Sequence, residues 1–304
     1  MRSELKIRRI CNKLLAVPLC IFLSLLVAGS ALASAWNAPT VQLTPAVLSP
    51  GDITLISVIP ADRVSSASIL WQKERIPLMR LADKDALAAF LAIPRDETAG
   101  SKEIALTLVR ADGEQFKRNL TLEVKAKEFP VQRLSLPEEK VTLAEKDLAR
   151  HQREKTAIQK ALAQPFAERL WQTSFQRPVP GDISTPFGVG RILNDKPRNS
   201  HSGVDLRGKT GDPVAAASDG IVILTGEHFF AGKSVYIDHG MGLITMYFHL
   251  SGILVEKGER VRVGQTIGLL GSTGRSTGPH LHWGLRVHNQ PADPLTLLTL
   301  FPLL

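Results

Sequence analysis

Cysteine is scarce in this chain of 304 residues: it occurs twice, at Cys11 and Cys20, both near the beginning. Disulfide bonds therefore cannot hold the remainder of the chain together. Residues 17–19 precede Cys20 with the sequence Val-Pro-Leu, where a lipoprotein signal carries small residues, and this argues against a lipid anchor. Beyond residue 35 no apolar run reaches the about 20 residues of a membrane-spanning helix, so we expect no membrane span there.

Other absences restrict the chemistry. The chain has no HExxH pattern, in which a glutamate serves as the general base of a zinc protease. Its basic residues form no stripe interleaved with aromatic residues, so we expect no nucleic-acid partner. The formal net charge is +8, of which residues 1–35 contribute +4 through five basic residues and one glutamate. The mild positive charge that remains suits an anionic surface such as a cell wall.

The first 35 residues predict a secretory signal peptide. Basic residues precede an apolar stretch at 14–28, and two small-residue cleavage patterns follow at 31–33 and 33–35. The apolar stretch is shorter than the about 20 residues that span a bilayer. We therefore expect export to the periplasm or cell envelope, with no stable membrane span after signal cleavage.

The hydrophobic pattern predicts a mainly β protein with three parts after the signal peptide: 36–130, 131–176 and 177–304. The first part reads as a small N-terminal β-sandwich, because short apolar runs alternate with turn residues. Such runs lie at 53–59, 104–109 and 120–124, and the sequence Ala-Asp-Gly-Glu at 111–114 predicts a hairpin. This part contains no histidine, so we expect a binding, spacing or regulatory role for it.

The second part predicts a helical linker. Thr142 and Glu145 match a capping box, which would open a charged helix that ends before Pro165. We expect His151 to be solvated on this helix. Apolar residues then follow that would dock the linker on a domain: Phe166, Leu170, Trp171 and Phe175.

The third part predicts an antiparallel β-domain rich in turns. Its glycines are frequent, and six short runs read as strands. These runs are 213–217, 220–225, 234–238, 243–248, 266–270 and 281–287. Of the remaining histidines, we expect a structural role for His239 and a loop or surface position for His228 and His288, with the lining of a groove as the alternative for His228.

The third part also concentrates the residues that suit a metal ion. His201 and Asp205 are four residues apart, His280 and His282 are two apart, and His249 lies between the pairs. In extended chain, each pair presents both side chains on one face. Imidazole nitrogen and carboxylate oxygen are zinc ligands, and a catalytic site leaves the fourth position to water. The spacing predicts a zinc site, but it leaves open whether His280 or His282 binds the metal.

Four sequence blocks in the third part resemble the M23 (lysostaphin or LytM type) zinc endopeptidases, which cut the peptide part of bacterial peptidoglycan. The resemblance covers residues 178–296, and its blocks are His-Ser-Gly-Val-Asp at 201–205, Tyr-Phe-His-Leu at 247–250, Gly-Ser-Thr-Gly at 271–274 and His-Leu-His-Trp at 280–283. It implies a C-terminal antiparallel β catalytic domain of the M23/LytM type. It assigns the zinc ligands to His201, Asp205 and His282, and the catalytic histidines to His249 and His280.

The resemblance implies a zinc metalloendopeptidase whose partners are peptidoglycan peptide stems. Some family members that cut glycine bridges carry a tyrosine before the first zinc histidine, and this chain has none there. We therefore favour meso-diaminopimelate–D-Ala cross-links as the substrate. The alternative is a non-enzymatic module of the same fold that binds wall or activates an amidase, but degenerate relatives of that kind lack zinc ligands. The sequence leaves open the separate roles of His249 and His280, a regulatory partner, and inhibition by the N-terminal part.

Overall fold

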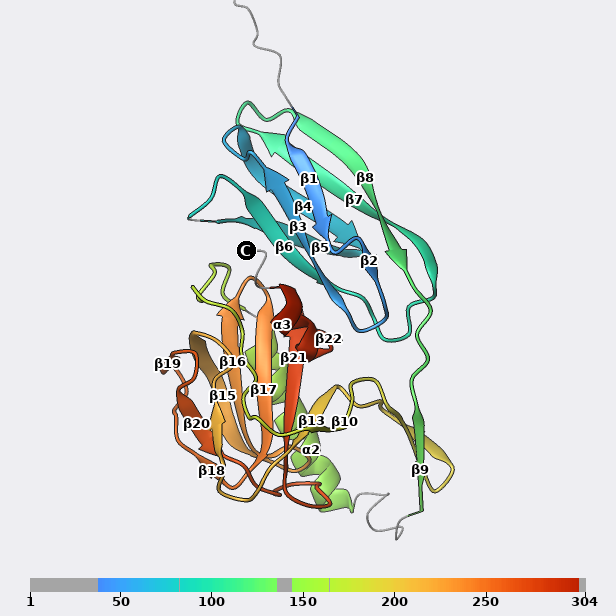
Figure 1. Ribbon diagram of the computed structural model, residues 1–304, viewed down its shortest axis with the longest axis vertical. Coiled ribbons are helices and arrows are strands. Elements are labelled where there is room, and N and C mark those ends of the chain that lie inside the picture. The colour runs from blue at the N-terminus through green and yellow to red at the C-terminus, as the bar shows by residue number, and fades with distance from the viewer. Residues whose placement is uncertain (1–37, 82, 136–143, 164, 301–304) are drawn as a thin grey trace, which may run out of the picture. The chain divides into compact units, whose positions relative to one another are not determined.

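The computed structural model describes residues 38–81, 83–135, 144–163 and 165–300, so the predicted signal peptide lies outside it. The protein is mainly β, as the sequence predicts, and two eight-stranded sheets dominate it (Figure 1). Two sheets of three strands accompany them. Within the described residues, no helix is both long and apolar enough to cross a membrane.

The N-terminal sheet has the strand order β1-β3-β6-β5-β4-β7-β8-β2. Its strands are β1 (Thr40–Thr44), β2 (Val47–Leu48), β3 (Ile53–Ile59), β4 (Val64–Trp71), β5 (Glu74–Arg80), β6 (Leu87–Ala92), β7 (Gly100–Arg110) and β8 (Gln115–Val124). The predicted hairpin is present between β7 and β8, and Gly113 takes the positive φ of 87° that its turn requires. Buried and exposed side chains alternate along β8, so one face of this hairpin packs inward.

The middle of the chain contains one long helix and two short sheet segments. Strand β9 (Val131–Leu134) pairs in parallel with β11 (Gly190–Leu193), which pairs in turn with β12 (Lys196–Arg198). Helix α2 spans Glu145–Leu162. Its N-cap is Ala144, with no side-chain cap hydrogen bond, so the predicted capping box is wrong; Thr142 itself lies outside the described residues. Acidic residues in the first turn favour the helix start through the helix dipole instead.

The C-terminal sheet has the order β10-β13-β21-β17-β16-β15-β19, and β22 pairs with β21. All six predicted strands are present. The elements are β10 (Ile183–Thr185), β13 (Gly203–Arg207), β14 (Pro213–Ala215), β15 (Gly220–His228), β16 (Gly232–Gly240), β17 (Leu243–Leu250), β18 (Gly252–Ile253), β19 (Arg260–Val261), β20 (Thr266–Leu269), β21 (His280–Val287), β22 (Gln290–Ala292), η1 (Pro294–Thr296) and α3 (Leu297–Leu300).

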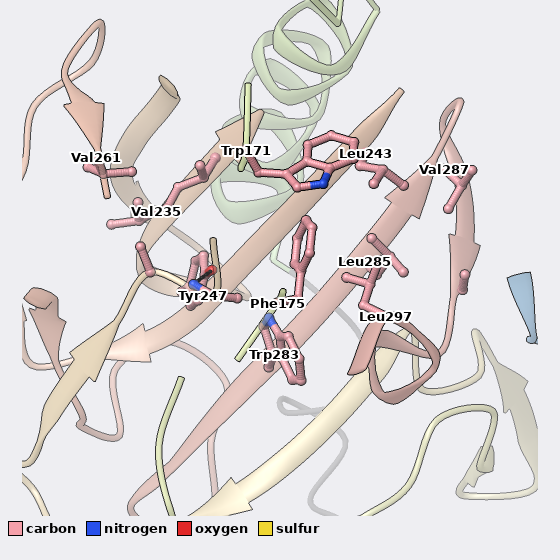
Figure 2. Packing of buried hydrophobic residues seen from close by; sticks show 14 of the residues in the cluster. Trp171, Phe175, Val235, Leu243, Tyr247, Val261, Trp283, Leu285, Val287 and Leu297 are labelled. Carbon is pink, nitrogen blue, oxygen red and sulfur yellow. Dashed lines mark hydrogen bonds between the residues drawn. The ribbon is translucent and has the colours of Figure 1, made fainter. Parts of the chain in front are cut away.

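One face of the C-terminal sheet forms the main hydrophobic core (Figure 2). Tyr247 of β17 and Trp283 of β21 are completely buried there, and Trp171 and Phe175 from the predicted linker pack with them. Residues of β3 and β6 belong to the same cluster. The docking of Trp171 and Phe175 is therefore confirmed, whereas Phe166 remains 44% exposed. The boundaries of the three parts stay a prediction.

The packing predicts that two aromatic residues of the linker differ greatly in how much they contribute to the free energy of unfolding. Trp171 is 2% exposed, and its ring centroid lies 5.7 Å from that of Phe175 and 6.1 Å from that of Phe90. We expect Trp171→Ala to lower the free energy of unfolding by about 3–5 kcal/mol, because it leaves a cavity. Phe166→Ala, the matched control, should cost less than about 1 kcal/mol. Urea unfolding of both variants measures the difference, and equal losses would contradict the packing described.

Candidate metal centre and catalytic site

Two neighbouring strands bring the predicted ligands together. In the pairing of β13 with β21, Asp205 lies directly opposite His282, and both side chains leave the face opposite the core. His201 precedes β13, and its amide N–H donates to the carbonyl oxygen of Val189. His201 Nε2 lies 2.9 Å from Asp205 Oδ1 and 2.9 Å from His282 Nδ1, and the last two atoms are 3.0 Å apart. All three side chains are buried and could hold a metal ion.

The protons of this cluster argue for a cation at its centre. His201 Nδ1 lies 2.8 Å from the carbonyl oxygen of Pro186 and donates to it, so Nε2 of the neutral ring offers a lone pair. Hydrogen bonds along all three edges would need a protonated Asp205, because an imidazole nitrogen cannot donate and accept at once. A single cation instead satisfies all three atoms. The donor set, two imidazoles and a carboxylate, fits zinc.

The surroundings fix the orientation of His282. The Phe248 ring stacks on its imidazole, with centroids 5.2 Å apart and an interplanar angle of 10°. Gly203 lies against the other side, where an added Cβ would come within 2.3 Å of the Trp283 carbonyl oxygen and 2.8 Å of His282 Nε2. Only glycine fits there. Burial raises the pKa of the Asp205 carboxyl, but the neighbouring imidazoles of His201 and His282 outweigh it and hold that pKa well below its usual range.

His249 and His280 lie beside the cluster with matching tautomers. His249 Nδ1 donates to the carbonyl oxygen of Thr273, and His280 Nδ1 donates to that of Gly278, both at 2.8 Å. In each neutral ring, Nε2 therefore keeps a lone pair. His280 Nε2 lies 3.7 Å from Asp205 Oδ1. The ring centroids of His249 and His280 are 4.8 Å apart. Burial lowers the pKa of His249 to about 4.

A β-bulge turns His249 towards the cluster. Between Tyr247 and Leu250, β17 has one residue more than β16 has between the paired residues Val235 and Lys233. His249 takes a φ of 64°, a left-handed conformation that is uncommon outside glycine. Regular alternation would place His249 on the same face as Tyr247, which is in the core. The bulge therefore redirects the side chain to the catalytic face, as bulges beside active sites commonly do.

The remaining histidines lie outside the cluster. His239 is structural, as expected: its Nδ1 lies 2.7 Å from the Asp219 carbonyl oxygen and its Nε2 lies 2.7 Å from Thr245 Oγ1. His288 occupies the turn between β21 and β22, so the expected loop position is confirmed, and partial burial lowers its pKa to about 4.

Two other histidines differ in part from the expectations. His228 is buried at the end of β15 and its Nδ1 is hydrogen-bonded to Ser234 at 2.7 Å, so the expected loop or surface position is wrong. The alternative is confirmed, because His228 lines a pocket beside α2. His151 is not fully solvated, because its ring contacts that of Phe230 edge-on at a centroid distance of 4.7 Å. The His228 contact crosses the β15–β16 hairpin, and the His151 contact joins α2 to the turn of that hairpin. The local sequence pattern gave no signal for either contact.

Sequence reasoning missed the groups that orient the histidines. Three of them are backbone carbonyls, at Pro186, Thr273 and Gly278, which any residue type supplies. Phe248 is the exception, because it precedes His249 within a recognisable block. Its contact with His282 follows from the pairing of β17 with β21, in which the two residues are partners.

The comparisons with known proteins point to one family. Residues 199–294 match the sequence model of Peptidase family M23. Peptidoglycan DD-endopeptidase ShyA from Vibrio cholerae is 44% identical over 128 residues, which are 41% of this chain and 30% of that protein. DD-carboxypeptidase/endopeptidase Mpg from Neisseria meningitidis is 41% identical over 115 residues, which are 38% of this chain and 26% of that protein. The chain thus spans less than a third of the length of these relatives.

A solved structure extends the likeness beyond the matched residues. A crystal structure from Pseudomonas aeruginosa, assigned to peptidase M23, is 27% identical and superposes with a TM-score of 0.63. The superposition covers 83% of this chain and 95% of that one. The similarity therefore includes strands that precede the matched family region.

Proposed function

We propose that this chain, which belongs to peptidase family M23 through residues 199–294, is a zinc-dependent endopeptidase that hydrolyses peptide cross-links of bacterial peptidoglycan. One observation carries the proposal: three lone-pair atoms converge within 3.0 Å of one another, beside two histidines that keep Nε2 unprotonated. In this proposal His201, Asp205 and His282 hold zinc. His249 and His280 are the catalytic residues.

The donor set suits zinc, and it leaves a coordination position for water. Held by His201, Asp205 and His282, zinc would polarise the scissile carbonyl and lower the pKa of a bound water towards about 7. The protein supplies the proton transfers. Nε2 of His249 or His280 takes the proton of the attacking water, and the resulting imidazolium gives a proton to the leaving amine. The carbonyls of Thr273 and Gly278 keep the two rings oriented during both transfers, because they hold Nδ1–H in place.

The proposed substrate is the direct cross-link between D-Ala and meso-diaminopimelate. Both relatives are named for DD cleavage, and ShyA for DD cleavage of peptidoglycan, which supports this choice. Some family members that cut glycine bridges carry a tyrosine before the first zinc histidine. The hairpin of β11 and β12, which precedes His201, has no tyrosine. We further propose that the protein is exported and acts in the periplasm or cell envelope.

A digest of defined dimers tests the proposal. The purified, zinc-loaded chain should convert a dimer cross-linked by D-Ala–meso-diaminopimelate into two monomers, which mass spectrometry identifies by the addition of one water. A dimer joined through a glycine bridge serves as the comparison and should remain intact. If the folded, zinc-loaded protein cleaves no cross-linked peptide, the non-enzymatic alternative replaces the proposal.

A further inference from the structure

A pocket of about 190 Å³ lies between α2 and the C-terminal sheet. Its apolar floor consists of Tyr236, Met246 and Phe248, from β16 and β17. Helix α2 closes one side with Ile158 and Leu162, which pack against the same strands. The pocket is thus a built feature of the fold, and the proposed hydrolysis leaves it without a role.

The pocket lies on the same face of the sheet as the proposed metal ligands. His282, Gly284 and Arg286 alternate along β21, so their side-chain positions share that face. The rise of a strand places Arg286 about 13 Å from His282. Aromatic rings connect the two places: Phe248 stacks on His282 and lies 5.3 Å, between centroids, from Tyr236 of the pocket floor. A substrate that reaches the metal with its scissile bond can therefore reach the pocket with a neighbouring side chain.

Arg286 lines the pocket, and its guanidinium carries an unused hydrogen-bond donor. Its Nε is buried and has no hydrogen-bond partner among the described residues, whereas Nη1 donates to the Asn289 carbonyl oxygen at 2.6 Å. Burial lowers the pKa of Arg286, but a guanidinium remains charged in proteins. A buried donor without an acceptor is unfavourable, and a carboxylate is the acceptor that matches a guanidinium best.

Glu154 provides the opposite charge on the α2 side of the pocket. Its Oε1 accepts from Arg150 Nε at 2.6 Å, and its Oε2 accepts from the Phe229 amide at 2.7 Å. An ionised carboxylate has about four acceptor positions, so Glu154 retains capacity for an ammonium donor. The backbone and Arg150 contacts also help hold the pKa of Glu154 below its ordinary value against the effect of burial, which keeps it charged.

We propose that this pocket binds the zwitterionic end of a diamino-acid side chain in the substrate, next to the bond that is cut. Arg286 pairs with the carboxylate, Glu154 pairs with the ammonium group, and the floor of Tyr236, Met246 and Phe248 covers the methylene groups. The inference rests on the proposed function and specifies its substrate. The residue before the scissile D-Ala is then a diaminopimelate with a free amino-acid end. Arg286 and Glu154 determine specificity and take no part in bond cleavage.

Two dimers that differ in one residue test the pocket. One carries diaminopimelate before the scissile D-Ala, and the other carries lysine, which lacks the carboxylate. The native protein should show a kcat/KM about tenfold to a hundredfold higher for the first, the usual value of a hydrogen bond to a charged group. The difference should appear mainly in KM. Arg286→Gln should remove this preference, whereas Arg260→Gln, the same change at an exposed position of β19, should retain it.

A second pair of substrates tests Glu154 and guards against misfolding of the Arg286 variant. Acetylation of the free amine on the diaminopimelate dimer should weaken cleavage by the native protein, but not further weaken cleavage by Glu154→Gln. Thermal melting checks that each variant folds. If Arg286→Gln does not fold, the comparison of the two dimers with the native protein still tests the inference. Equal cleavage of the diaminopimelate and lysine dimers by the native protein overturns the inference. Cleavage of neither dimer would instead contradict the proposed function.

Discussion

His201→Ala is expected to remove bound zinc and to abolish peptide hydrolysis. The change deletes one of three atoms that lie within 3.0 Å of one another in a buried cluster, and the two atoms left cannot complete a catalytic zinc site. Zinc content, measured by atomic absorption on purified protein, should fall from one ion per chain to near zero. Cleavage of a defined dimer should fall to the rate without enzyme.

A histidine outside the cluster provides the control for this result. His288 lies in the turn after β21 with a φ of 46°, a conformation that asparagine tolerates. His288→Asn should therefore retain zinc and activity. Full zinc occupancy in a folded His201→Ala protein would show that the ligand assignment is wrong.

Replacement of the two catalytic histidines is expected to separate metal binding from turnover. His249→Ala and His280→Ala should each retain one zinc ion, because neither side chain belongs to the three-atom cluster. Turnover should fall by about 10²–10⁴-fold, the usual contribution of a general acid or base. Steady-state kinetics on a defined dimer and zinc analysis of the same samples measure both effects.

The strained backbone at His249 calls for a second variant. Alanine is unfavourable at a φ of 64°, so His249→Ala alone could lose activity through a local change in β17. His249→Asn accepts this conformation and lacks a comparable base, so it should show the same loss. If the His249 and His280 variants lose zinc instead of turnover, these histidines are ligands and the proposed division of roles fails.

The alternation of side chains along strands made part of the site predictable. His280 and His282 share a face of β21 because they are two residues apart, and Asp205 meets His282 because β13 pairs with β21. The sequence indicates such spacing directly, and it predicts most of β21, whereas β13 is not among the predicted strands. The choice of His282 rather than His280 as a ligand came from the family resemblance, since both side chains leave the same face.

The position of His249 could not be predicted in the same way. Its side chain reaches the catalytic face through a bulge, and no glycine marks the left-handed residue. Bulges of this kind depend on the pairing of β17 with β16, which is a property of the whole sheet. The start of α2 was also misplaced, because Glu145 supports the helix as its first residue rather than as part of a capping box.

Contacts between distant segments set the remaining features. Arg286 lines a pocket with Glu154 because α2 lies against the C-terminal sheet, and the two residues are far apart in sequence. The burial of Trp171 likewise depends on Phe90 and Phe175 together. Hydrophobic periodicity predicts that a segment has an apolar face, but it does not specify the partner of that face.

Zinc titration of the chelator-treated protein tests the central claim most directly. The account predicts that the metal-free chain does not cleave a D-Ala–meso-diaminopimelate dimer. Activity should then rise in proportion to added zinc and reach its plateau at one ion per chain, because the described residues form one such cluster. Undiminished cleavage by a chain shown to be free of metal would contradict the account.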